Sequence, residues 1–229
     1  MTAQFWVAVG QIILIDILLG GDNAVVIALA CRSLPEAQRV KGILWGTAGA
    51  IILRVILIAF ALTLLAIPYL KLVGGALLVW IGVKLLMPQD EDEHGNIQAS
   101  DKLWGAVKTV IVADLVMSID NVIAIAGAAQ GAGEQHQMPL VIFGLLVSIP
   151  IIVWGSQLVL KLMDRFPLII TFGGMLLGWI AGTMIHTDPG LVAYIPQEAA
   201  WHYGMGLTGA LAVLLIGKLA ARRQAPAQG

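Results

Sequence analysis

The sequence predicts an all-α membrane protein with seven transmembrane helices, arranged as two inverted three-helix repeats plus a seventh helix. Three observations lead to this prediction: an apolar composition, seven long apolar runs, and a motif that recurs at a fixed offset. Of the 229 residues, 59% are hydrophobic and 12% are charged, whereas soluble domains carry roughly 25% charged residues. The net charge of −1 argues against a nucleic-acid partner, and the single cysteine excludes an internal disulfide or a cysteine metal cluster.

A helix that crosses a bilayer needs roughly 20 apolar residues. No basic residue precedes the first apolar run, so we expect a retained helix there and not a signal peptide. Breakers such as Pro35, Pro68 and Pro167 separate successive runs. The predicted spans are residues 5–30, 42–66, 69–87, 104–130, 139–160, 168–185 and 201–219.

The positions of Lys and Arg predict the orientation. In a seven-helix arrangement they gather in the loops of one side, while the other side has only Lys71 and the second span contains Arg54. The positive-inside rule then places the N-terminus outside and the C-terminus in the cytoplasm of a multi-pass protein of the cytoplasmic (inner) membrane. The expected parts are a first three-helix repeat at 1–88, an acidic cytoplasmic linker at 89–102, a second inverted repeat at 103–187, and an outer loop, seventh helix and basic tail at 188–229.

The linker contains the acidic run Asp90-Glu91-Asp92-Glu93-His94. Such a run is either a solvated connection between two halves or a mouth that attracts cations, because clustered carboxylates raise the local cation concentration.

The two halves on either side of the linker repeat. When 98 is added to each residue number from 5 to 31, ten of the 27 positions are identical. The third helices align at an offset of 99, which matches two Gly-Gly pairs at 74–75 and 173–174. Because each half has three helices, the second half enters the membrane from the opposite side, as in many secondary transporters with a binding site at the repeat interface. The shared polar residues are Asp16, Asp22 and Asn23 in the first half, and Asp114, Asp120 and Asn121 in the second.

These six residues form two copies of a D-x5-D-N pattern inside apolar helices. One charged Asp at a helix centre costs on the order of 3 kcal/mol, so we interpret the set as a metal site and keep polar contacts between helices as the alternative. Carboxylate and amide oxygens suit Mn²⁺, Mg²⁺ or Ca²⁺. Close carboxylates without a cation must share protons, which makes exchange of metal for protons natural. The candidate ligands are therefore Asp16, Asp22, Asn23, Asp114, Asp120 and Asn121.

Antiparallel packing of the first and fourth helices would place Asp22-Asn23 level with Asp114, and Asp16 level with Asp120-Asn121. We expect Gly20-Gly21 to break the first helix and turn Asp22 inward. Ser118, at the matching place, can bond back to the carbonyl four residues earlier and bend its helix more mildly.

Two further residues have open roles. Met117 either adds a thioether ligand, which would favour Mn²⁺, or packs against its neighbours. Arg54 either neutralises a carboxylate when metal is absent or fixes a helix permanently.

The Gly-x3-Gly spacings allow close helix packing, within the chain or in a homo-oligomer. The outer loops carry six acidic or histidine residues, which form either a mouth that receives cations or a plain surface. They are Glu134, His136, His186, Asp188, Glu198 and His202.

The paired motifs Gly20-Gly21-Asp22-Asn23-Ala24 and Ser118-Ile119-Asp120-Asn121 resemble those of the TerC family of integral membrane proteins. The chain looks most like the compact YjbE-like branch, which belongs with the LysE-type transporters of inverted three-helix repeats. The resemblance covers nearly the whole chain. It implies manganese efflux, with a historical link to tellurium-ion resistance, and it implies that the six motif residues line the metal site.

The sequence thus predicts a non-enzymatic exporter of divalent cations, foremost Mn²⁺, driven by proton exchange. We expect no permanently bound cofactor, and we expect the lipid bilayer and the transported metal as partners. The alternatives are a transporter of Ca²⁺, Mg²⁺ or a tellurium oxyanion, an intramembrane aspartyl enzyme that would need two Asp sharing a proton, and a scaffold without transport.

Overall fold

The structure, a computed structural model, describes residues 21–60, 67–87, 99–130 and 137–224, with the single residues 10, 14 and 64. In α5 it leaves out the side chain of residue 120 and those from 122 onward. Across these ranges the chain is helical and contains no strand. The helices are the segment Gly21–Cys31, then α2 (Glu36–Ala59), α4 (Leu70–Leu86), α5 (Ala99–Gln130), α6 (Gln137–Arg165), α7 (Leu168–His186) and α8 (Ala199–Gln224).

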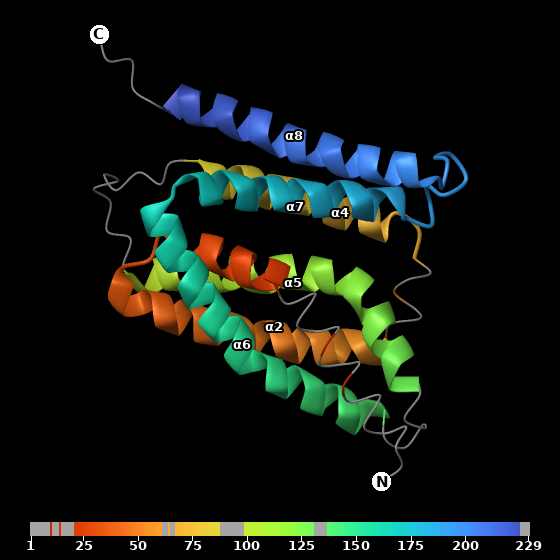
Figure 1. Cartoon of the computed structure of the whole chain (residues 1–229), viewed down its shortest axis with the longest axis horizontal. Helices are drawn as coiled ribbons and strands as arrows, with labels where there is room; N and C mark the ends of the chain where they lie inside the picture. The colour runs from red at the N-terminus through yellow and green to blue at the C-terminus, as the bar shows by residue number, and fades with distance from the viewer. Residues whose placement is uncertain are drawn as a thin grey trace.

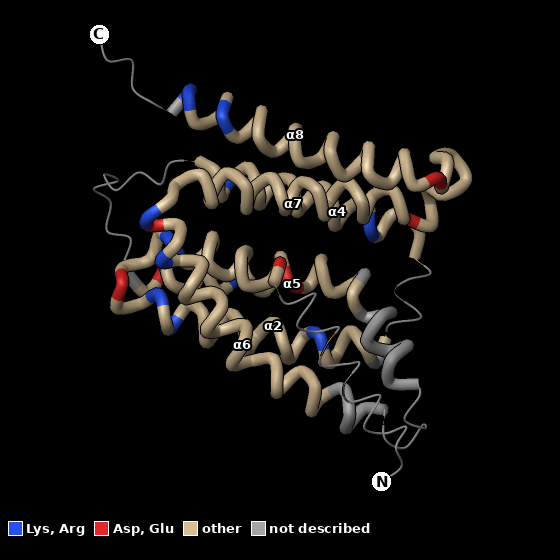
Figure 2. Tube along the Cα trace, viewed as in Figure 1, with Lys and Arg blue, Asp and Glu red and all other residues tan. Residues whose placement is uncertain are grey.

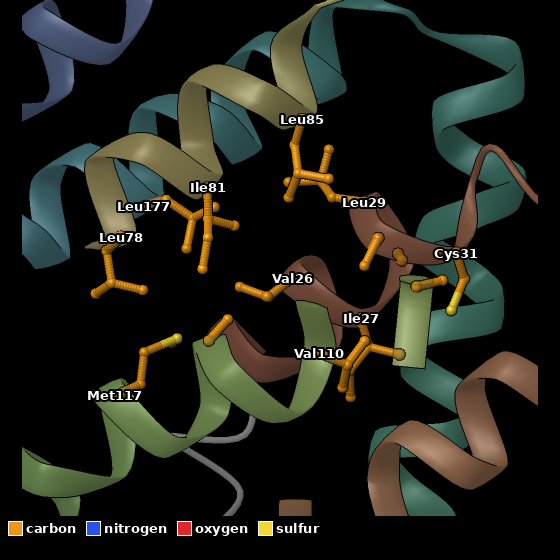
Figure 3. Close-up of a cluster of buried hydrophobic side chains, with 14 of the residues drawn as sticks. Val26, Ile27, Leu29, Cys31, Leu78, Ile81, Leu85, Val110, Met117 and Leu177 are labelled. Carbon is orange, nitrogen blue, oxygen red and sulfur yellow. The ribbon is translucent and has the colours of Figure 1, made fainter. Parts of the chain in front are cut away.

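Successive helices run in alternate directions, and α8 lies on one face of the bundle with α2 and α6 on the other (Figure 1). The most extensive contacts join α7 to α8, α2 to α5 and α4 to α7. The segment Gly21–Cys31 lies beside α5. Between them and the α4–α7 pair is an apolar core that includes Val26, Val110, Leu78 and Leu177 (Figure 3).

The outer surface of the bundle is strongly apolar. The helices α2, α6, α7 and α8 are each long and apolar enough to cross a membrane, and α4, with 17 residues, is at the lower end of the roughly 17–25 residues that a span needs. An exposed surface of this kind matches lipid and not water. The large exposed side chains include Trp45, Ile52, Trp80, Trp104, Trp154, Phe172 and Leu215.

Several helices extend beyond the predicted apolar spans. The helix α2 begins at Glu36 and not at residue 42, since Pro35 precedes its first turn and the acidic Glu36 suits the positive end of the helix dipole. It ends at Ala59, before the predicted residue 66. The helix α5 begins at Ala99, so the last four residues of the predicted linker 89–102 are helical, with Asp101 in the first turn. Of the predicted first span, the described helical residues are Gly10, Leu14 and those of the segment Gly21–Cys31.

The helix α6 continues to Arg165 and stops at the break formed by Phe166 and Pro167, beyond the predicted end at residue 160. Pro150 lies inside α6 without ending it. These extra turns carry polar and charged residues, which an apolar pattern cannot detect.

Basic residues gather at one end of the bundle, where α2 begins and where α6 and α8 end (Figure 2). Some of them hold helix ends together. Arg32 donates to the carbonyl oxygens of Leu85 (3.0 Å) and Met87 (3.4 Å) at the end of α4. Arg39 forms an exposed ion pair of 2.8 Å with Asp164 at the end of α6.

At the opposite end, Asp188 follows α7 and closes the start of α4. Its buried carboxylate accepts hydrogen bonds from the backbone N–H groups of Tyr69 (2.8 Å), Leu72 (3.0 Å) and Gly190 (2.7 Å). Burial raises the pKa of Asp188, but these donors and the N–H of Lys71 outweigh burial, so its pKa lies below the ordinary 3.8. The Asp188 carboxylate therefore ties the α7–α8 connection to α4.

Glycines let α7 and α8 approach until their backbones touch. A Cβ added to Gly178 would overlap the carbonyl oxygen of Gly209, and one added to Gly182 would overlap that of Met205. Such small-residue contacts are a common way for membrane helices to pack. By contrast, a Cβ added to Gly204, also on α8, would have nothing within 4 Å.

We predict that Gly182→Ala destabilises the protein by roughly 1–3 kcal/mol, because the new methyl group forces α7 and α8 apart. The free energy of unfolding of the purified protein in detergent measures this effect. Gly204→Ala is the matched control and should leave that free energy nearly unchanged or slightly higher. Equal losses in the two variants would contradict the close α7–α8 contact.

We also predict that stability depends on pH through Asp188. Because its pKa is lowered in the folded state, the carboxylate stabilises the fold above about pH 4, and this contribution is lost as the pH falls through the folded-state pKa. Asp188→Asn should cost roughly 1–3 kcal/mol at pH 7 and should approach the wild type below pH 4. Thermal unfolding between pH 3 and 7 checks this, with the exposed Asp101→Asn as control. Equal midpoints of the wild type and Asp188→Asn at pH 7 would show that Asp188 does not hold α4.

Candidate metal centre

The described motif residues lie on two neighbouring helices. Asn23 is 3% exposed on the segment Gly21–Cys31, where Asp22 is half-buried. On α5, Asp114 is 6% exposed and Asn121 is half-buried. Asp16 lies outside the described residues, as does the side chain of Asp120, and so does the predicted break at Gly20.

Asp114 is held by a buried network of three side chains. Its Oδ1 atom forms an ion pair of 2.5 Å with Nη2 of Arg54 on α2, and Arg54 is 3% exposed. Ser118 lies one turn along α5 and donates its hydroxyl to Oδ2 of Asp114 (3.1 Å), while Nε of Arg54 donates to Oγ of Ser118 (3.1 Å). The expectation that Ser118 bonds to a backbone carbonyl is therefore wrong, because the charged pair beside it offers a stronger acceptor and a stronger donor.

A small cavity of about 10 Å³ adjoins this network. The polar residues Asn23, Thr47, Arg54 and Asp114 line it, and its size suits about one water molecule. Asn23 and Asp114 thus meet at one level, as antiparallel packing of their helices predicts. The apolar part of the wall is formed by Ile27, Ala50, Ile51 and Ile152.

Two buried side chains at this cavity lack hydrogen-bond partners. Both Oδ1 and Nδ2 of Asn23 and the Oγ1 atom of Thr47 are buried and unpaired within the part of the chain that is described. Buried polar groups in native proteins nearly always have a partner, so these atoms point to a polar occupant. The oxygens at the cavity belong to a carboxylate, an amide and a hydroxyl, which are hard ligands suited to Mg²⁺, Ca²⁺ or Mn²⁺. Arg54 and the Nδ2 atom of Asn23, which also line it, are hydrogen-bond donors and suit an acceptor such as water.

The sequence did not single out Thr47. A signal was present, because Thr47 and Arg54 are seven residues apart and so lie on the same face of α2. Across the described ranges, no group of three or more His, Cys, Asp or Glu residues is close enough to hold a metal ion. Any site formed by these residues therefore has to use the neutral oxygens of Asn23 and Thr47 as well as the Asp114 carboxylate.

Met117 does not line the cavity. It is 4% exposed and belongs to the apolar core, where Figure 3 shows it near Leu78 on the side of α5 that faces α4. The structure therefore supports packing as the role of Met117, and a preference for Mn²⁺ cannot be based on its thioether.

The outer-loop histidines connect elements of the fold. His186 is buried, its Nε2 lies 3.0 Å from the carbonyl oxygen of Pro196, and its Nδ1 lies 3.4 Å from Nδ1 of His202. Together with Asp188 they hold the α7–α8 connection, while Glu198 is exposed. Outside the described residues are Glu134 and His136.

We predict that Arg54→Met destabilises the fold by about 3–5 kcal/mol, because it leaves the Asp114 carboxylate buried without its partner. The double variant Arg54→Met with Asp114→Leu should recover most of this loss, since apolar side chains of similar size often replace a buried ion pair at little cost. The free energy of unfolding in detergent of the two single variants and the double variant measures the coupling. Strictly additive losses would contradict a direct pair.

Comparison with known proteins identifies the family. A model of the integral membrane protein TerC family matches residues 1–225. The chain is similar to YjbE, an uncharacterized membrane protein of Bacillus subtilis (strain 168), with 42% identity over 198 residues that cover 86% of this chain and 88% of YjbE. It is also similar to YceF, an uncharacterized membrane protein of the same organism, with 26% identity over 209 residues that cover 86% of this chain and 79% of YceF.

A further relative is the UPF0053 inner membrane protein YgdQ of Escherichia coli (strain K12), with 24% identity over 178 residues that cover 71% of this chain and 73% of YgdQ. No solved structure matches the chain. The family match extends over nearly the whole sequence, and the apolar helix bundle agrees with it. The chain therefore belongs to the TerC family of integral membrane proteins.

Proposed function

We propose that this protein exports divalent metal cations, foremost Mn²⁺, across the cytoplasmic membrane in exchange for protons. The observation that carries the proposal is the buried cavity at which Asn23, Thr47 and Asp114 meet inside an apolar helix bundle. Ionisable groups within membrane helices are costly and usually mark an ion or proton pathway. The oxygen donors support a hard divalent cation, and the link of the TerC family with manganese efflux supports Mn²⁺ among such cations.

In this proposal, the full site uses Asp16, Asp22, Asn23, Asp114, Asp120 and Asn121. The ion pair of Asp114 with Arg54 gives the cation a competitor, because an arginine cannot lose its proton in a protein. A cation that binds Asp114 must therefore displace the Arg54 guanidinium from that carboxylate.

Charge balance makes proton exchange suitable for such a site. Four ionised Asp residues and one Arg carry a net charge of −3, which one divalent cation reduces to −1. Two protons bound to the carboxylates give the same net charge. Carboxylates that lie close together without a cation hold protons, so the metal-free and metal-bound states can have equal charge.

We infer a membrane topology of seven spans in two inverted repeats, with the N-terminus outside and the C-terminus in the cytoplasm. The alternating helix directions and the basic end of the bundle support it (Figures 1 and 2). So does the pairing of α4 with α7, the third helices of the two halves. An added Cβ on Gly75 of α4 would lie 2.9 Å from the carbonyl oxygen of Ala181. Similarity to YjbE supports the YjbE-like branch of the LysE-type transporters, and the name of YgdQ supports an inner membrane location.

The other hypotheses fit the observed site less well. A tellurium oxyanion would meet a carboxylate at the cavity, although Arg54 offers one positive charge. An aspartyl enzyme needs two Asp residues that share a proton and a water, whereas Asp114 is paired with a guanidinium. Ca²⁺ and Mg²⁺ fit the same oxygen donors as Mn²⁺ and have to be separated by experiment.

We predict that Asp114→Asn and Asp120→Asn each lower Mn²⁺ export on the order of tenfold or more, because a neutral amide is a weaker ligand for a divalent cation than a carboxylate. Cells that express each variant should be more sensitive to Mn²⁺ and contain more manganese than cells with the wild type. Uptake of Mn²⁺, Mg²⁺ and Ca²⁺ by inside-out membrane vesicles measures the cation preference directly.

Asp101→Asn is the matched control, since Asp101 is exposed in the first turn of α5 and lies away from the cavity. It should export Mn²⁺ like the wild type. Undiminished export by well-inserted Asp114→Asn and Asp120→Asn would contradict the proposed site. Lack of transport of all three cations by the wild type would favour the scaffold.

A further inference from the structure

Two histidines face each other where α7 ends and α8 begins, at the end of the bundle opposite to the basic one (Figures 1 and 2). His186 is the last residue of α7, and His202 lies in the first turn of α8. Their Nδ1 atoms are 3.4 Å apart. The ring planes cross at 75° with the ring centroids 5.3 Å apart, so the rings are not stacked and their Nδ1 atoms face each other.

The hydrogen bond on the other side of His186 determines which of its nitrogens is free. Its Nε2 atom lies 3.0 Å from the carbonyl oxygen of Pro196, and a carbonyl oxygen can only accept, so Nε2 carries the proton. In the neutral ring, Nδ1 then has a lone pair on the side of His202. Histidines that bind metals usually donate their other N–H to a backbone carbonyl or a carboxylate, because this bond fixes the ring and its tautomer.

The spacing of the two Nδ1 atoms suits a shared metal ion better than a hydrogen bond. A hydrogen bond from an N–H group ordinarily spans roughly 2.7–3.2 Å, which is shorter than the observed 3.4 Å. Two Zn–N bonds of about 2.05 Å to atoms 3.4 Å apart enclose an angle of about 112° at the metal. That angle is close to the tetrahedral geometry that Zn²⁺ adopts in proteins.

The surroundings of the pair can receive a cation. The charged residues in the first turn of α4, the α7–α8 connection and the first turn of α8 are Lys71, Asp188 and Glu198, so one positive and two negative charges give a sum of −1. Glu198 is exposed and His202 is half-buried, so the pair lies near the surface, where water can complete a coordination shell. Within the described ranges no cluster of three His, Cys, Asp or Glu residues is placed to hold a metal, so we expect two protein ligands and water.

We propose that His186 and His202 bind one borderline divalent transition-metal ion, such as Zn²⁺, through their Nδ1 atoms. The proton of the neutral His202 ring is then carried by its Nε2 atom, which leaves Nδ1 free for the metal. Imidazole suits Zn²⁺, whereas Mg²⁺ and Ca²⁺ prefer oxygen ligands. The ion clamps the end of α7 to the start of α8. This site lies outside the intramembrane centre, and it does not depend on the proposed export of Mn²⁺.

The test uses the full-length protein in detergent at neutral pH, without a polyhistidine tag. It compares the wild type with His202→Gln, with His186→Gln and with the control His94→Gln, which removes an imidazole of the predicted linker and leaves the pair intact. The unfolding midpoint is measured in a chelator and with increasing ZnCl₂, because a ligand that binds the folded state stabilises it. Equilibrium dialysis measures the Zn²⁺ bound by the folded protein.

ZnCl₂ should raise the wild-type midpoint, and a chelator should reverse the rise. In His202→Gln and His186→Gln, the Zn²⁺ concentration needed for half of the rise should increase about tenfold or more, and tenfold corresponds to about 1.4 kcal/mol of binding free energy. His94→Gln should respond like the wild type. A wild-type midpoint that Zn²⁺ leaves unchanged, or wild-type affinity in His202→Gln, would overturn the inference. If the buried His186→Gln does not fold, the half-buried His202→Gln decides.

A further variant separates the histidine pair from the intramembrane centre. Asp114→Asn should keep the wild-type affinity for Zn²⁺ while it loses Mn²⁺ export. If Asp114→Asn loses the response to Zn²⁺ and His202→Gln keeps it, Zn²⁺ binds at the intramembrane centre and the histidine site is refuted. If the histidine variants alone lose the response and Asp114→Asn exports Mn²⁺ normally, the histidine site stands and the proposed export site falls.

Discussion

The buried ion pair between Arg54 and Asp114 is the interaction on which the centre of this protein depends. Both residues are almost completely buried, and removing one partner of a buried ion pair leaves a costly buried charge. The pair therefore fixes how α2 faces α5, the two helices that share one of the most extensive contacts in the fold. Thr47, two turns before Arg54 on α2, faces the cavity as a consequence.

The same pair also bears on the proposed ion site. The sequence left open whether Arg54 neutralises a carboxylate when metal is absent or fixes a helix permanently, and the structure shows which carboxylate it pairs with. Arg54 neutralises Asp114 and joins α2 to α5. A cation bound to Asp114 would replace one positive partner by another, so the carboxylate would keep a counter-charge in either state.

Much of the fold could be predicted from the sequence, because apolar runs of sufficient length have few alternatives in lipid. The helix ends could not, because α2, α5 and α6 continue with polar residues such as Glu36, Asp101 and Arg165. The repeated motif identified Asn23 and Asp114, because the free-energy cost of placing an amide or a carboxylate in an apolar helix is evident from residue type alone. The partners of these residues were harder to predict, since they depend on the direction of each side chain. In the sequence, Thr47 is an ordinary residue of an apolar helix. Only the structure shows that its buried hydroxyl makes no hydrogen bond to a carbonyl of its own helix.

The contact between α7 and α8 has a mechanical consequence. Two helices that meet through side chains can slide as those side chains change rotamer, but the backbones at Gly178 and Gly182 touch α8 directly and leave no layer that could adjust. The carboxylate of Asp188 adds α4 to the same block by bonding the backbone at its first turn. Sliding of α7 along α8, or of α4 away from the α7–α8 connection, would therefore have to break these backbone contacts.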